Sequence, residues 1–288
     1  MSRISEQNLE RYTRNLKTYM AHALNEVTVA TFYIENAKTI TIDNLDGNNV
    51  TIDWNGDGSD VETINTTYGK HTYKKGTYTC KIYNLTTIGD SSFMGTPLTN
   101  ILIGSTVKNL GQKAFQQTLL TSIVIPKNIT YMGNNIFNGL ETLETAVFNA
   151  SVTSIPTGTF RNCKNLTSFN IPDYITTIVN NVFTSCTNLT SIVIPKSVTF
   201  IGNGVFNSCT NLTSIVIPKS VTSIGSKAFN DSSNLTIHCE ATSEPSTWTS
   251  DWHGDILESK IKWGYFEYKE QAQKLIDDVI NGALGGSY

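Results

Sequence analysis

The histidines, and the acidic residues near them, are the side chains of this 288-residue chain that could act in acid–base catalysis. The four histidines lie in four separate segments, at His22, His71, His238 and His253. Asp251 and His253 could form an acid–base pair, but any serine could complete a triad with them by chance. The sequence contains no HExxH, GxSxG, P-loop or GxGxxG pattern. We therefore expect a protein that is not an enzyme and that uses no cofactor.

Oxygen-bearing residues at alternate positions could hold a calcium ion. Asp53, Asn55 and Asp57 precede Gly58, as in the first half of a calcium-binding loop. The twelfth position of such a loop carries a closing carboxylate, whereas this chain has Ile64 there. We interpret the segment as a structural hairpin without metal, with a calcium site as the alternative.

Three of the five cysteines, Cys163, Cys186 and Cys209, recur every 23 residues. This spacing predicts thiols stacked in successive turns with parallel side chains, an arrangement that is awkward for a disulfide. We expect reduced cysteines that pack in a core. A metal or redox role is the alternative.

The elements that would position these residues repeat with the same period. Residues 189–211, LTSIVIPKSVTFIGNGVFNSCTN, are followed by LTSIVIPKSVTSIGSKAFNDSSN at 212–234. In each unit, Leu-x-x-Ile-x-Ile predicts a short strand that proline ends. An Ile-Gly pair, as at Ile201–Gly202, predicts a bend at which glycine takes a positive φ. Such self-similarity is the signature of a solenoid, whose units bury their apolar sides only by stacking.

The pattern L-x-x-I-x-I-P-x-x-V-x-x-I-G-x-x-x-F-x-x-C-x-N resembles the BspA-type leucine-rich repeat across residues 85–241. This resemblance implies a mainly β fold, a leucine-rich repeat solenoid of about six units, and a non-catalytic surface for adhesion or protein contact. Asn149 replaces the proline that ends the strand, and Pro156 and Val179 replace the glycine of the Ile-Gly pair. We expect the middle turns to bend differently for this reason.

The outward positions of the strands are the best candidate for a binding site. One row is hydroxylic, with Ser122, Thr145, Ser168, Ser191 and Ser214, and the row beside it is Leu102, Val124, Val147, Asn170, Val193 and Val216. An uncharged, partly apolar stripe of this kind either binds a partner or is covered by another part of an assembly. The alternative is that these residues only favour strands. We predict that a protein or a surface glycan binds there.

Four Asn-Leu-Thr triplets fit the acceptor pattern for N-glycosylation; they begin at Asn165, Asn188, Asn211 and Asn234. The asparagines also share one position of the repeat, where a side chain can hydrogen-bond the backbone of the next unit. We favour this ladder, because a glycan there would have to project from a packed turn.

Amphipathic patterns at both ends predict helices outside the solenoid. In residues 1–27, one apolar stripe is formed by Leu9, Tyr12, Leu16 and Tyr19. It either docks on its own chain or joins copies in a homo-oligomer. The opening ISEQNLERYTRNLKTYM resembles the N-terminal helix of phage tail and fibre proteins, which implies a docking element of a virion. Residues 265–288 predict a second helix with a Gly-rich tail.

Two further regions flank the solenoid. Residues 28–84 contain the alternating segments TITI, NVTIDW and TYTCKI, which predict a small β-domain. Segments 53–59 and 71–78 resemble the paired signatures of PKD-like β-sandwich domains, which are usually spacers. Residues 242–264 supply Trp248, Trp252 and Trp263, which we interpret as a cap over the open end of the core. A ligand-binding role for these tryptophans is the alternative.

Composition narrows the class of partner. A net charge of −3 and a pI near 5.8 argue against nucleic acid. No apolar run approaches the ~20 residues that cross a bilayer, and the opening residues are polar, so we expect no membrane insertion and no secretory signal peptide. The leading prediction is a phage virion component, in a tail, a fibre or a head decoration, that presents the solenoid for attachment. The alternatives are a bacterial cell-surface adhesin exported by another route and an intracellular interaction scaffold.

Overall fold

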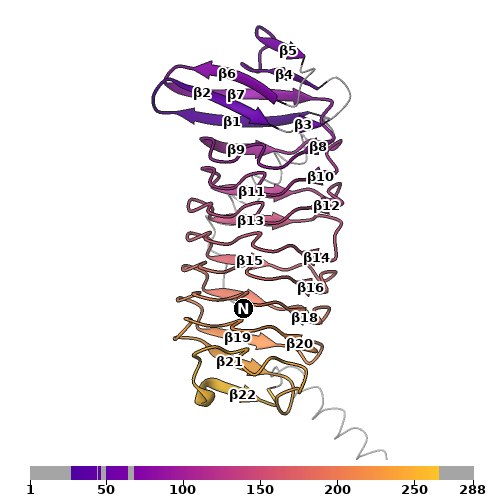
Figure 1. Ribbon diagram of the computed structural model, residues 1–288, viewed down its shortest axis with the longest axis vertical. Helices are drawn as coiled ribbons and strands as arrows, with labels where there is room; N and C mark the ends of the chain where they lie inside the picture. The colour runs from indigo at the N-terminus through magenta and orange to yellow at the C-terminus, as the bar shows by residue number, and fades with distance from the viewer. Residues whose placement is uncertain (1–26, 44, 47–49, 64–67, 266–288) are drawn as a thin grey trace, which may run out of the picture.

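The computed structural model describes residues 27–43, 45–46, 50–63 and 68–265. Their strands stack along one long axis, from a β-domain at one end to the last strand at the other (Figure 1). The predicted mainly β solenoid is confirmed. The helices predicted for residues 1–27 and 265–288 fall almost entirely outside the described residues and stay predictions.

The described elements, in chain order, are β1 (Thr28–Ile34), β2 (Lys38–Asp43), β3 (Leu45–Asp46), β4 (Thr51–Asp53), β5 (Val61–Thr63), β6 (Tyr68–Tyr73), β7 (Gly76–Tyr83), β8 (Thr87–Ile88), β9 (Leu98–Leu102), β10 (Asn109–Leu110), β11 (Ser122–Ile125), β12 (Tyr131–Met132), β13 (Thr145–Phe148), β14 (Ser154–Ile155), β15 (Ser168–Asn170), β16 (Thr177–Ile178), β17 (Ser191–Val193), β18 (Phe200–Ile201), β19 (Ser214–Ile217), β20 (Ser223–Ile224), β21 (Thr236–Cys239), the 3-10 helix η1 (Glu258–Lys260) and β22 (Ile261–Trp263).

The β-domain contains antiparallel strands in two sheets. One sheet has the order β5-β4-β7-β1-β9, and β2 pairs with β6 in the other. Alternation in sequence sets the buried side: along β1, Ala30, Phe32 and Ile34 are buried, whereas Tyr33 between them is exposed. The resemblance to PKD-like domains stays a prediction.

The β-domain also covers the first strands of the solenoid. β1 pairs antiparallel with β9, the first long strand of the repeat, and β3 pairs antiparallel with β8. An open edge strand offers unpaired N–H and C=O groups to other chains. These two pairings cover the open edges of β9 and β8 at the N-terminal end of the solenoid.

Each solenoid turn contributes two parallel strands, which stack in two separate ladders. We call the stack of longer strands (β11, β13, β15, β17, β19, β21) the first ladder and that of two-residue strands (β8, β10, β12, β14, β16, β18, β20) the second (Figure 1). In the first ladder, strand pairing joins β11 to β13, β15 to β17 and β19 to β21, and it is interrupted between these pairs. The register of strand pairing matches the 23-residue period of the sequence, because Ser168 pairs with Ser191 on β17 and Thr177 pairs with Phe200 on β18. Equivalent side chains of successive units therefore lie side by side.

A column of phenylalanine rings fills the centre of the solenoid. All seven rings are fully buried, and neighbouring ring centroids lie 5.5–5.8 Å apart with interplanar angles of 5–13°. The rings belong to Phe93, Phe115, Phe137, Phe160, Phe183, Phe206 and Phe229. Offset parallel stacking of this kind adds to the gain from burying the rings.

The predicted positive φ at the Ile-Gly pairs is wrong. Gly202 and Gly225 have ordinary backbone angles, but a Cβ atom built on Gly225 would lie 2.6 Å from the Asn203 nitrogen and 2.8 Å from the Gly202 carbonyl carbon. The Gly225 N–H donates to the Ile201 oxygen at 2.8 Å. Glycine is needed here because two backbones pass closely, and not because of its backbone angles.

Replacement of this glycine breaks the second ladder at one place only within the described ranges. β12 and β14 are not paired, and Pro156 occupies the glycine position directly after β14. The expected change in the middle turns is confirmed there. At Val179 the expectation of a changed turn is wrong, because the Val179 N–H donates to the Ile155 oxygen at 3.1 Å and the second ladder continues.

Candidate functional site

The outward side of the first ladder is built by strand alternation. On β17, Ile192 is 6% exposed and points into the core, whereas Val193 is 74% exposed. We call the outward positions of this ladder the strand face; they are Ser122, Val124, Thr145, Val147, Ser168, Asn170, Ser191, Val193, Ser214, Val216, Thr236 and His238.

The register brings the predicted binding residues into contact range in pairs. Val124 pairs with Val147, and Asn170 pairs with Val193. Parallel neighbours lie about 4.8 Å apart across a ladder. Within each pair the predicted positions therefore lie side by side, although β13 is not hydrogen-bonded to β15 nor β17 to β19. Their role in binding stays a prediction. Leu102 differs from the others, because it lies on β9 beside Val29 of the β-domain.

The strand face has a hollow between β17 and β19. Its volume is about 250 Å³, and its lining includes Val193, Val216 and the two strand-ending prolines Pro195 and Pro218. Glu240 closes one end; this carboxylate is only 8% exposed and accepts a hydrogen bond from the Lys219 N–H at 2.9 Å. The repeat pattern predicts the row of side chains but not this hollow, since no single unit differs there.

At the C-terminal end of the strand face, an uncharged histidine lies beside a lysine. His238 pairs with Val216 on one side and Lys262 on the other. Burial, and then the nearby Lys262 ammonium, lower the pKa of His238, so its ring is uncharged at neutral pH. The ring also lies 4.4 Å from that of Tyr265, centroid to centroid.

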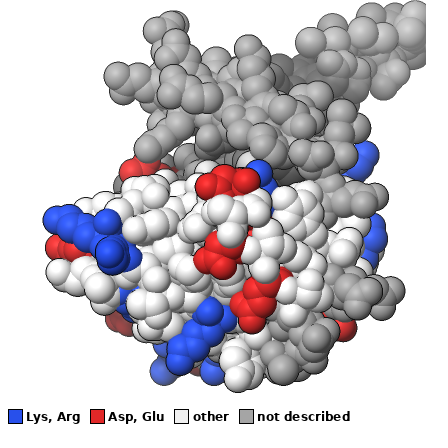
Figure 2. Space-filling model, turned by 90° about the horizontal axis from the view of Figure 1, so that it is seen from above, with Lys and Arg blue, Asp and Glu red and all other residues white. Residues whose placement is uncertain are grey.

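Charged groups are dispersed at the other end of the molecule. Figure 2 looks down on the β-domain and shows acidic and basic side chains interspersed among uncharged surface. On the described part of this face there is no continuous positive stripe that would follow a nucleic-acid backbone.

The structure separates the two residues that could have formed an acid–base pair. The Asp251 carboxylate accepts from the Ser226 hydroxyl at 2.6 Å, and His253 Nε2 faces Glu258 Oε1 at 3.2 Å. Asp251 is thus held by the last solenoid unit, and His253 by a residue of the C-terminal cap. Neither residue lines any of the three hollows described among residues 27–265.

The calcium-like segment forms the turn between β4 and β5. Asp53 is 2% exposed, and its two carboxylate oxygens accept from the N–H groups of Gly56 at 2.8 Å and Gly58 at 2.9 Å. Asp57 accepts from the Ser59 N–H at 2.8 Å. The segment is the structural hairpin that we predicted, and the described ranges hold no cluster of three or more His, Cys, Asp or Glu side chains that could bind a metal.

The predicted packing role of the cysteines is confirmed. Cys163, Cys186 and Cys209 are fully buried free thiols, and each donates to the backbone oxygen of the phenylalanine in the preceding turn at 3.2–3.3 Å. Burial raises the pKa of Cys209 to about 12, so its thiol stays protonated and unreactive at neutral pH. Cys80 and Cys239 are buried in the same way.

The asparagine ladder is present in the last units. Asn211 Nδ2 donates to Asn188 Oδ1 at 3.3 Å, and Asn234 Nδ2 donates to the Thr210 oxygen at 3.1 Å. These bonds go to the preceding unit, either to its side chain or to its backbone, whereas we expected bonds to the backbone of the next unit.

Two ladders of parallel strands around a phenylalanine column, with an uncharged outward face, define a leucine-rich repeat solenoid. The chain belongs to the family described as BspA type leucine rich repeat region, which matches residues 61–121 and 108–236 in six copies. Proteins of this family are generally structural or binding proteins and not enzymes. No helix in the described residues is long and apolar enough to cross a membrane.

Solved structures of leucine-rich repeat proteins are similar to this chain. A leucine-rich repeat protein from Bacteroides ovatus is 26% identical over 59% of this chain and 45% of its own, with a TM-score of 0.55. One from Eubacterium ventriosum is 30% identical over 57% of this chain and 43% of its own, with a TM-score of 0.46. A leucine rich repeat protein from T. pallidum is 22% identical over 59% of this chain and 77% of its own, with a TM-score of 0.45. The chain thus spans less than half the length of the first two. A search of curated proteins finds no match.

Proposed function

We propose that this chain is a non-enzymatic binding protein that holds a partner protein against the strand face, with the hollow between β17 and β19 at the centre of the contact. The observation that carries this proposal is the exposure of Val193, which is 74% exposed and lies beside Val216 at that hollow. The hollow is mainly apolar, with Ser214, Lys196 and Glu240 as the polar residues of its lining, and an apolar centre with polar groups around it is the usual composition of a protein interface.

The backbone of the strand face limits how a partner can bind. β15 is paired with β17 and β19 with β21. β17 and β19 are not hydrogen-bonded to each other, but they lie next to each other, so there is no space to add a strand between them and contact must be made by side chains. A hollow of about 250 Å³ accepts one aliphatic or aromatic side chain of the partner, which is how anchor residues act in protein interfaces.

Paired lysine substitutions test this surface. Val193→Lys with Val216→Lys would bury two unpaired ammonium groups in the contact, and we expect the affinity for the partner to fall by about 100-fold or more. Proteins from bacterial surfaces and from phage particles are captured on the immobilised full chain, and each captured protein is then titrated against the variant.

The matched control adds the same charge elsewhere. Thr199→Lys with Thr222→Lys alters two exposed positions beside the second ladder, in successive units. Binding should persist in this control, and circular dichroism should show both variants folded. A partner that binds the Val193/Val216 variant as tightly as the unaltered chain rejects the strand face as the site.

Two settings fit such a contact. A virion component is supported by residues 4–20, with the stripe Leu9, Tyr12, Leu16 and Tyr19 as an oligomerisation element, and a cell-surface adhesin is supported by the family. The mass in solution of the full chain, compared with that of a chain lacking residues 1–26, separates them. An oligomer that the truncation converts to a monomer favours the virion, and two monomers favour the adhesin or an intracellular scaffold.

A further inference from the structure

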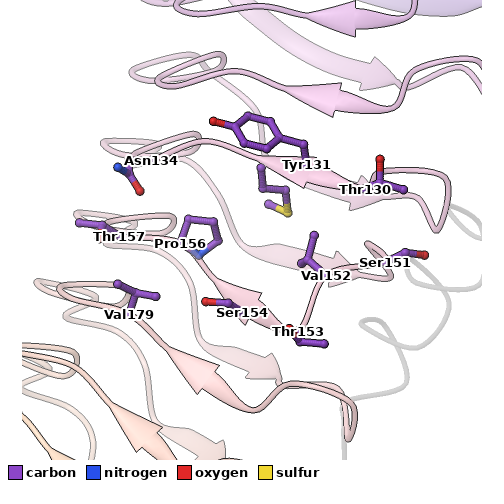
Figure 3. Close-up of a pocket in the computed structure, with 11 residues that line it drawn as sticks. Thr130, Tyr131, Asn134, Ser151, Val152, Thr153, Ser154, Pro156, Thr157 and Val179 are labelled. Carbon is purple, nitrogen blue, oxygen red and sulfur yellow. The ribbon is translucent and has the colours of Figure 1, made fainter.

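A second hollow opens where the second ladder is broken between β12 and β14 (Figure 3). Its volume is about 510 Å³, and Tyr131, Asn134, Ser154 and Thr157 contribute polar groups to its lining. It lies on the other ladder from the strand face. We propose that this hollow binds a neutral saccharide.

Pro156 explains why the ladder opens here. In the preceding turn, the Gly133 N–H donates to the Leu110 oxygen at 2.8 Å, and a Cβ on Gly133 would lie 2.5 Å from the Gln112 nitrogen. Pro156 has no N–H to donate to Met132 at the equivalent point, and its ring occupies space that glycine leaves free. The two turns are therefore held apart.

The break leaves backbone groups without their usual partners. Elsewhere in the second ladder, the Thr130 N–H donates to the Lys108 oxygen and the Thr176 N–H donates to the Thr153 oxygen, both at 2.8 Å. Within the described residues, the equivalent bond from the Thr153 N–H to the Thr130 oxygen does not form. A donor and an acceptor thus face the gap, and polar groups of this kind favour a ligand that replaces the lost hydrogen bonds.

In the described part of the chain, the Asn134 side chain at the same break also lacks the hydrogen bond that its equivalents make to the next turn. At one position of the repeat, Asn180 Oδ1 accepts from the Asn203 N–H, and Asn203 Oδ1 accepts from the Ser226 N–H, both at 2.8 Å. Asn134 holds the same position, yet among the described residues its amide makes no such bond to the Thr157 N–H. An amide that can both donate and accept is therefore available at the hollow.

The lining selects the chemical class of the ligand. It contains hydroxyl, amide and apolar side chains but no acidic or basic ones, so a charged ligand would find no counter-charge. Tyr131, 58% exposed, supplies an aromatic ring at the edge of the hollow. Sugar rings combine hydroxyl groups that donate and accept with an apolar C–H face that packs on an aromatic ring. A peptide strand fits less well, because β14 offers an edge of only two residues.

Titration with neutral oligosaccharides tests the site. The probes are hexose and N-acetylhexosamine oligomers of two to six units, with sialylated forms as anionic probes, and binding to the full chain is measured by saturation-transfer NMR and calorimetry. At least one neutral probe should bind, and Tyr131→Ala and Asn134→Ala should each weaken it about tenfold, the equivalent of one lost contact. Tyr33→Ala removes a ring that is 46% exposed on β1 and should leave affinity unchanged.

A second variant addresses the break itself. Pro156→Gly supplies the missing N–H and removes the ring, so the ladder should close and the affinity should fall about tenfold. The proposal is overturned if no neutral probe binds, if only the anionic probes bind, or if affinity is unchanged in Tyr131→Ala or Pro156→Gly. Val193→Lys with Val216→Lys should bind saccharide normally, so failure of the strand face and failure of this site are distinguishable.

Discussion

Phe206→Ala should lower the free energy of unfolding by about 3–5 kcal/mol, the usual loss for a buried aromatic ring. Phe206 is fully buried between Phe183 and Phe229, with ring centroids at 5.6 and 5.5 Å. Each neighbouring ring is held by its own turn, so neither can move into the cavity. Because each unit of a solenoid is stabilised by its neighbours, the loss should reach the whole array. Urea unfolding of the full chain, followed by circular dichroism, measures it.

Tyr131→Ala is the matched control for this prediction. It also removes an aromatic ring from the solenoid, but that ring is 58% exposed. Its loss should change the free energy of unfolding by less than about 0.5 kcal/mol. If Phe206→Ala unfolds at the same urea concentration as the unaltered chain, the phenylalanine column is not what holds the turns together.

Trp252→Ala should cost about 3–5 kcal/mol as well, because this tryptophan closes the C-terminal end of the column. Its ring is fully buried and meets the Phe229 ring edge-on, with centroids 5.8 Å apart. Its Nε1 donates to Glu244 at 3.1 Å, and Trp248 packs against it at 4.8 Å. Removal of the ring exposes the last turn of the core to water, and thermal unfolding of the full chain should show the loss.

Leu257→Ala serves as the control within the same cap. Leu257 is 65% exposed, so its truncation should leave the melting temperature nearly unchanged. A Trp252→Ala chain that melts like the unaltered one would show that the tryptophan does not cap the core. In that case, ligand binding by the tryptophans would become the favoured interpretation.

The sequence predicts most of the solenoid because its signal repeats in every unit. Equivalent residues 23 positions apart are placed side by side, as Ser168 and Ser191 are, and the inward and outward positions of each strand follow from its alternation. The buried cysteines follow from the same register. These inferences need only the period and the geometry of stacked strands.

The sequence does not predict features that depend on contacts other than those between equivalent residues of successive repeats. The pairing of β1 with β9 joins segments that share no motif, so the sequence does not show that the β-domain covers the solenoid. The Ile-Gly pattern shows that glycine is required at Gly225 but not that a close backbone is the reason. Pro156 marks an irregular turn in the sequence, whereas the hollow beside it depends on how far the two turns separate.

The most direct test of the central claim asks whether Val193 is covered when the partner is bound. The five natural cysteines are buried, so a single Val193→Cys substitution provides the one reactive thiol among the described residues. Maleimide labelling is timed in the free chain and in the chain saturated with a captured partner, with Leu257→Cys as an exposed control in the cap. We predict that the partner slows labelling at position 193 about tenfold or more and leaves position 257 unaffected. Equal labelling at position 193 with and without the partner would contradict binding through the strand face.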